Sequence, residues 1–115
     1  MSSFTRTIPA YKPRSLVEDL LASTDSTIPL SFRPTRAEPG DFIYLIHQGY
    51  LVGRACITAI DPASLTPDPP PWAKWLIRCR GHWELPPRPI PAQGHQGVRY
   101  LPYAGLPILA DEKWP

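Results

Sequence analysis

The chain has few of the features that mark membrane-spanning, disulfide-rich or nucleotide-hydrolysing proteins. It has two cysteines, Cys56 and Cys79, with no cysteine or histidine at metal-ligand spacing, so a reduced, metal-free protein is expected. No apolar run approaches the roughly 20 residues that cross a bilayer, and the polar N-terminus lacks the layout of a signal peptide. Glycine-rich phosphate loops are also missing. These absences favour a soluble, cytoplasmic protein with no membrane partner and no cofactor.

Proline is the residue that the chain has in excess. The 115 residues include 17 prolines, which is about three times the usual usage. Proline interrupts helices and central strands, so short strands joined by irregular loops are expected. The length suits one domain with one hydrophobic core.

Residues 38–61 carry the clearest local signal. Two apolar runs of β-type residues, 42–47 and 50–60, flank a polar turn that ends at Gly49, which predicts a hairpin. Gly49 supplies the positive φ that a short hairpin loop often needs, and Gly53 marks a close backbone approach or a bulge. The first run is apolar on both faces and is therefore predicted to be a central strand.

The flanking segments predict one helix and further strands. Residues 1–14 indicate an extended arm with a short strand near 5–8. Ser15 and Glu18 form a capping box, which predicts a helix over 15–23.

Downstream of the hairpin, residues 75–80 alternate between apolar and basic side chains and predict a third strand. The proline-rich residues 86–91 are expected to wrap across the domain, and 98–101 to form a last strand. A further strand or turn is expected at 106–109. The predicted organisation is an arm over 1–14 and a single domain over 15–115.

The order of these signals resembles the PUA-like superfamily, with EVE and ASCH domains as the nearest types. The resemblance rests on Gly40 and Asp41 before the first hairpin strand, Gly53 in the second, the strand that begins at Trp75, and the late Gly97-x-Arg99. It implies an α+β, mainly β fold, a small mixed β-barrel with one or two short helices. The EVE pattern also implies aromatic side chains around a pocket for an extruded or modified base.

Charge and aromatic content point toward nucleic acid. Between Phe32 and Tyr100 the chain has eight basic and five acidic residues, and seven of the eight are arginine. Arginine binds phosphate and base edges through its planar fork, and aromatic rings stack on bases. The candidate binding residues are Arg33, Arg36, Tyr44, Trp72, Lys74, Arg78, Arg80, His82 and Trp83. We therefore predict a non-catalytic domain that binds RNA or a modified or flipped DNA base, without a metal.

Two alternatives stay open at this stage. One is a small ASCH-like hydrolase that acts on a modified nucleoside or amide. The resemblance implies a Lys-Thr-Glu grouping for such an enzyme, and residues 31–36 have neither lysine nor glutamate. The other is a protein-interaction module or a homodimer, and the sequence leaves the oligomeric state open.

Overall fold

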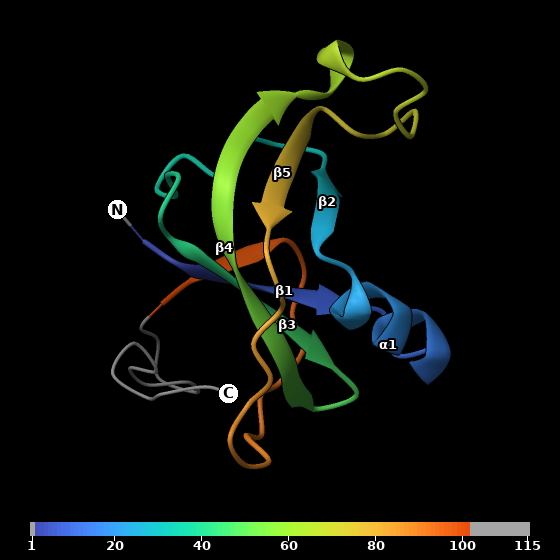
Figure 1. Cartoon of the computed structure of the whole chain (residues 1–115), viewed down its shortest axis with the longest axis vertical. Helices are drawn as coiled ribbons and strands as arrows, with labels where there is room; N and C mark the ends of the chain where they lie inside the picture. The colour runs from blue at the N-terminus through green and yellow to red at the C-terminus, as the bar shows by residue number, and fades with distance from the viewer. Residues whose placement is uncertain (1, 102–115) are drawn as a thin grey trace.

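Six strands form one open, mixed sheet in the computed structural model, which describes residues 2–101 of the chain (Figure 1). The strand order is β2-β5-β4-β3-β1-β6, and β1 and β3 are the parallel pair. The elements are β1 (Phe4–Ile8), α1 (Arg14–Ala22), β2 (Asp25–Leu30), β3 (Phe42–His47), β4 (Tyr50–Pro62), the 3₁₀ helix η1 (Ala63–Leu65), β5 (Trp75–Arg80) and β6 (Val98–Tyr100). The expected mainly β fold with short helices is confirmed. The expected closed barrel is not formed by these residues, because the edge strands β2 and β6 are not hydrogen-bonded to each other.

The predicted hairpin is confirmed as β3 and β4. His47 pairs with Tyr50 across a two-residue loop. Gln48 has a φ of 51° and Gly49 a φ of 84°. Positive φ at both loop residues is the geometry that matches the twist of a two-residue hairpin. Strand β3 lies between β4 and β1, which is the central position that its apolar faces predict.

Gly53 is both a bulge neighbour and a close-approach site. Leu45 pairs with Gly53 while Ile46 pairs with Leu51, so Val52 is an extra residue in β4. A Cβ at position 53 would lie 2.5 Å from the Cδ2 atom of Leu21 in α1. The missing side chain therefore lets α1 dock against the sheet.

Strand β4 belongs to both halves of the sheet. Its first half pairs with β3 and its second half with β5, and a second register shift lies between Ile57 and Ala59. The strand curves strongly along its length in Figure 1. The curved sheet surrounds a hydrophobic core. Its buried members are Phe4, Ile28, Leu30, Ala37, Ile43, Leu45, Ala55, Ile57, Ile77, Cys79 and Trp83. Ile77 and Cys79 of β5 thus belong to the core, whereas Trp75, on the same face of that strand, does not. Cys79 is buried, Cys56 is half-buried, and both are free thiols as expected.

A second apolar cluster covers the outer face of the hairpin. It consists of Tyr44, Ile46, Leu51, Ile90 and Ala92. The amide of Leu51 donates to the carbonyl of Ile90 at 2.9 Å, and the amide of Ala92 donates to the carbonyl of Gly49 at 2.9 Å. The proline-rich segment is thus a wrap across the domain, as predicted.

One expectation about the N-terminal part is confirmed and one needs correction. The short strand expected near 5–8 is β1, which pairs with β3 on one side and with β6 on the other. The helix begins at Arg14 with Pro13 at its N-cap and without a side-chain cap hydrogen bond, so Ser15 does not form the predicted capping box. The ring of Pro13 fixes its φ, which is −68°, and its ψ of 149° makes the backbone extended just before the first turn. The strand or turn expected at 106–109 lies outside the described residues.

We expect Gly53→Ala to destabilise the protein by about 1–2 kcal/mol, because the new methyl group must displace Leu21. Chemical denaturation of four variants checks this: wild type, Gly53→Ala, Leu21→Ala and the double variant. In the Leu21→Ala background the methyl group has room, and Gly53→Ala should cost little or stabilise the strand. An equal cost in both backgrounds would contradict the packing explanation.

Candidate functional site

Two of the predicted binding residues lie inside the protein. Tyr44 is 2% exposed and Trp83 is 5% exposed. The Tyr44 hydroxyl accepts a hydrogen bond from Arg54 Nη1 at 3.1 Å, and Trp83 Nε1 donates to Ser26 Oγ at 2.9 Å. Neither ring offers a face to solvent, so the stacking role predicted for them does not fit this structure.

The arginines on the outer face of β5 have acidic neighbours. Arg78 Nε donates to Asp61 Oδ2 at 2.7 Å, and Arg78 Nη2 donates to Thr66 Oγ1 at 2.8 Å. Arg80 is exposed and pairs in register with Asp25 of β2. The sequence predicts a basic strand face, but the fold places acidic residues from β4 and β2 beside these arginines. The net positive charge of this face is therefore small.

Arg33, Lys74 and Trp72 gather at the end of the sheet where β2 finishes and β5 starts. The guanidinium of Arg33 lies over the ring of Trp75, 4.9 Å from its centroid. Trp75 pairs with Leu30, and the amide of Lys74 donates to the carbonyl of Leu30 at 2.9 Å. Lys74 is exposed, and Trp72 is 51% exposed.

Arg36 lies on the same loop as Arg33, between β2 and β3, and makes a second arginine–aromatic contact. Its guanidinium lies 4.8 Å from the ring centroid of Tyr100, and its amide donates to the Tyr100 hydroxyl at 3.2 Å. Arg36 Nη2 donates to Ser2 Oγ at 3.3 Å. The loop after β2 is thereby held against β6 and the start of β1.

The cations of this end are not matched by carboxylates. Within residues 2–101 the ion pairs are Arg14–Glu18, Arg54–Glu84 and Arg78–Asp61. Arg33, Arg36 and Lys74 take part in none of them. We call the exposed set of Arg33, Arg36, Trp72 and Lys74 the basic-aromatic end.

His82 and Arg80 lie at the other end of β5. Gly81, between them, has a φ of 92° and its amide donates to the carbonyl of Thr24 at 2.8 Å. Both side chains are exposed beside the chain that links α1 to β2. The structure thus separates them from the basic-aromatic end by the length of β5.

Three residues at or near the basic-aromatic end were not among the predicted binding residues. Trp75 and Tyr100 carry the arginine stacks, and Arg6 lies half-buried on β1. Alternation along β1 could have indicated Arg6, because it shares a face with the apolar residues Phe4 and Ile8. No local pattern indicates the stacks, since their partners are far apart in the sequence.

Arg54 is a buried cation with a structural role. Its guanidinium lies 4.7 Å from the Phe42 ring centroid, and Nη2 donates to Glu84 Oε2 at 3.0 Å. Burial acts to lower the pKa of Arg54, but hydrogen bonds to Glu84 and Tyr44 outweigh it and raise the pKa above its ordinary value. Arg54 therefore stays charged and ties β4 to the segment after β5.

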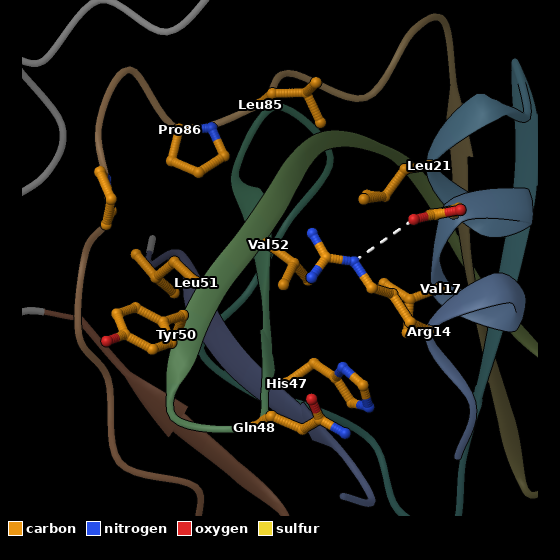
Figure 2. Close-up of a pocket in the computed structure, with 12 residues that line it drawn as sticks. Arg14, Val17, Leu21, His47, Gln48, Tyr50, Leu51, Val52, Leu85 and Pro86 are labelled. Atoms are coloured by element: carbon orange, nitrogen blue, oxygen red, sulfur yellow. Dashed lines mark ion pairs between the residues drawn. The ribbon is translucent and has the colours of Figure 1, made fainter.

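A groove of about 680 Å³ lies between α1, the hairpin and the proline-rich segment (Figure 2). Figure 2 shows Val17 and Leu21 projecting from α1 toward Val52 of β4. The lining residues are mostly aliphatic or proline, and they are Arg14, Val17, Glu18, Leu21, His47, Gln48, Tyr50, Leu51, Val52, Leu85, Pro86 and Pro89. The volume is in the range of small-molecule sites.

The hairpin turn contacts the segment that precedes α1, beside this groove. His47 Nε2 lies 3.1 Å from the carbonyl oxygen of Lys12, and Gln48 Nε2 donates to the carbonyl of Ala10 at 3.2 Å. These contacts hold the segment before α1. His47 is 5% exposed, so its ring forms part of the groove wall.

The described residues contain no group of three or more His, Cys, Asp or Glu side chains that could hold a metal ion. They also contain no helix with the length and apolar character to cross a membrane.

We expect Glu84→Ala to destabilise the protein by about 1.5–3 kcal/mol, because it removes a charged hydrogen-bond partner from buried Arg54. Glu18→Ala is the matched control, since its pair with Arg14 is exposed and such i,i+4 pairs contribute only about 0.5 kcal/mol. Urea denaturation measures both variants. Equal, small losses would show that Arg54 does not depend on Glu84.

Comparison of the chain with protein-family models, with curated proteins and with solved structures found no match.

Proposed function

We propose that this chain is a PUA-like domain of the EVE or ASCH type that binds nucleic acid without catalysing a reaction on it. The mainly β architecture with a helix docked on a curved sheet supports the fold part of this proposal. The order of elements around the hairpin is the order on which the resemblance rests.

The observation that carries the binding proposal is the basic-aromatic end. The guanidinium groups of Arg33 and Arg36 each lie over an aromatic ring, at 4.9 and 4.8 Å from the ring centroids. Stacking fixes the plane of a guanidinium while its N–H edge stays open to phosphate oxygens or base edges. The exposed ring of Trp72 offers a stacking surface for a base.

Single-stranded nucleic acid fits this surface better than a duplex. The bases of a single strand are free to stack on an exposed ring, whereas duplex bases are already stacked on one another. Arg33, Arg36 and Lys74 supply charge for the backbone. RNA and DNA single strands both satisfy this chemistry.

The resemblance implies a pocket for an extruded base, and the groove of Figure 2 is a concave site that could be compared with it. Its lining differs from the aromatic pocket that the resemblance implies, because Tyr50 is the one Phe, Tyr or Trp residue among those that line the groove. It is also built from α1 and the hairpin turn and not from the residues of the basic-aromatic end. We therefore assign the main binding role to the basic-aromatic end.

Fluorescence anisotropy with short RNA and DNA strands, at several salt concentrations, tests the proposal. We expect affinity to fall as salt rises, and Arg33→Ala or Arg36→Ala to lower the log–log salt slope by about 1. Trp72→Ala should cost about 1–3 kcal/mol of binding free energy through the lost stack. Duplexes of the same sequence should bind more weakly.

Lys12→Ala is the matched control, because the Lys12 ammonium also lies over an aromatic ring, Tyr11, at 5.6 Å. Lys12 follows the far end of β1 and should leave the binding curve unchanged. Salt-independent binding, or an equal loss in the control, would sink the proposal. Turnover of a modified nucleoside by the wild-type protein would instead favour the hydrolase alternative.

A further inference from the structure

The groove of Figure 2 lies against the irregular part of β4. Val52 is the extra residue at the first register shift, and its chain neighbour Leu51 lines the same groove. Consecutive residues of a regular strand point to opposite faces of a sheet, but a bulge re-aims a side chain. The bulge therefore lets two aliphatic side chains of one strand line one groove. Helix α1 adds Val17 and Leu21, which project toward Val52.

The third wall of the groove is also apolar. It is formed by Leu85, Pro86 and Pro89, on the segment after β5. Leu85 and Tyr50, which belong to two different walls, are each 49% exposed. Apolar surface gains free energy when a ligand removes it from water. The groove therefore favours a ligand with an apolar body.

The arginine and the glutamate of the lining form an ion pair with each other. Arg14 Nε lies 3.3 Å from Glu18 Oε1, and the two side chains are mostly exposed to solvent. An ionic ligand would lose part of its hydration in the groove and would meet a cation and an anion side by side. The pair therefore gives no net attraction for a charged group, and the groove suits an uncharged ligand.

His47 gives the groove a hydrogen-bond acceptor. The ring is 5% exposed, and its Nε2 lies 3.1 Å from the carbonyl oxygen of Lys12. A carbonyl oxygen only accepts, so Nε2 carries the proton in this contact and Nδ1 of the neutral ring has a free lone pair. No residue in the described part of the chain donates to Nδ1. Figure 2 shows the ring reaching from the hairpin toward Arg14 and Val17.

We propose that this groove binds a small uncharged molecule with an apolar body and an N–H or O–H group that donates to His47 Nδ1. The aliphatic and proline side chains cover the body of the ligand, and the histidine fixes its orientation. Small-molecule sites typically combine apolar walls with a few polar groups of this kind. The inference goes beyond the proposed function and does not depend on it, because the groove shares no residue with the basic-aromatic end.

A nucleobase matches the groove less well than such a molecule does. The edges of a base carry several donors and acceptors, whereas most residues of the lining are aliphatic or proline. Polar groups that lose water without gaining a partner weaken binding. A ligand with one donor on an apolar ring avoids this loss.

Indole and 1-methylindole are matched probes, because they share an apolar ring system and differ at the N–H group. Isothermal titration calorimetry with the full chain should show about 2- to 10-fold tighter binding of indole, which is the effect of one hydrogen bond. His47→Phe keeps a ring at this position and removes the acceptor, so it should abolish the preference for indole. Equal affinities in wild type, or a preference that survives His47→Phe, would overturn the inference.

A second measurement covers the case in which His47→Phe does not fold, since that variant also loses the contact with Lys12. In the wild-type protein, indole should change the ¹⁵N chemical shift of His47 Nδ1 and 1-methylindole should change it much less. Equal shifts with the two probes, or none, would contradict the proposed hydrogen bond.

A groove-filling variant locates the probe. Val52→Phe should weaken both probes by at least tenfold, because the larger ring occupies the space beside α1. Leu65→Phe is the matched control, since Leu65 is 70% exposed on η1 and does not line the groove. Trp72→Ala should also leave indole affinity unchanged. Binding that is lost in Trp72→Ala and kept in Val52→Phe would place the probe elsewhere and remove the inference.

Two further results would assign the groove to another occupant and so overturn the inference. One is displacement of indole by a short RNA or DNA strand, which would make the groove part of the nucleic-acid site. The other is a wild-type dimer in sedimentation that excludes both probes and that Val52→Phe dissociates. Strand binding that indole leaves unchanged would support two separate sites.

Discussion

The fold depends on strand β4, which joins the two halves of the sheet. Strand β4 pairs with β3 along its first half and with β5 along its second, so a single run of backbone joins the β1-β3-β6 side to the β2-β5 side. Its two register shifts let it curve around the core. Gly53 sits next to the first shift and gives α1 its docking place. A side chain at that position would separate the helix from the strand that holds both halves together.

Strand β4 also contributes one residue to each of two ion pairs that include an arginine. Arg54 and Asp61 both lie on β4, and they form ion pairs with Glu84, on the segment after β5, and with Arg78 of β5. Charges near β4 are therefore used to hold neighbouring segments in place. Arg33 and Arg36, on the loop after β2, instead lie over the aromatic rings of Trp75 and Tyr100 and form no ion pair within residues 2–101.

Local sequence signals predicted much of the fold and little of the site. The hairpin, the strand over 75–80 and the short strand at 98 follow from periodicity and glycine placement, which act over a few residues. The capping box failed because the N-cap is Pro13, two residues before Ser15, so Ser15 lies inside the first turn of the helix. The strand near 5–8 was predicted, but its place between β3 and β6 was not, because strand pairing is set by contacts with distant residues that the local sequence does not contain.

The candidate site was harder to predict than the fold, because the type of a residue does not reveal which side chains it will contact in the folded protein. Arg78 and Arg33 look alike in the sequence, yet one meets Asp61 and the other meets the ring of Trp75. Trp83 and Trp72 differ in the same way, since one donates to Ser26 in the core and the other is exposed.

Both edge strands have features that keep the sheet open. Pro29 in β2 lacks the N–H that a further strand pair would need, which suits an edge strand. Strand β6 has three residues and gives little length for pairing. Side chains join the two edge strands where backbone hydrogen bonds do not. The Phe32 ring, just after β2, lies beside Gly97, just before β6, and the Tyr100 hydroxyl of β6 accepts a hydrogen bond from the amide of Arg36. The loop after β2 therefore closes this side of the core through packing and one side-chain hydrogen bond.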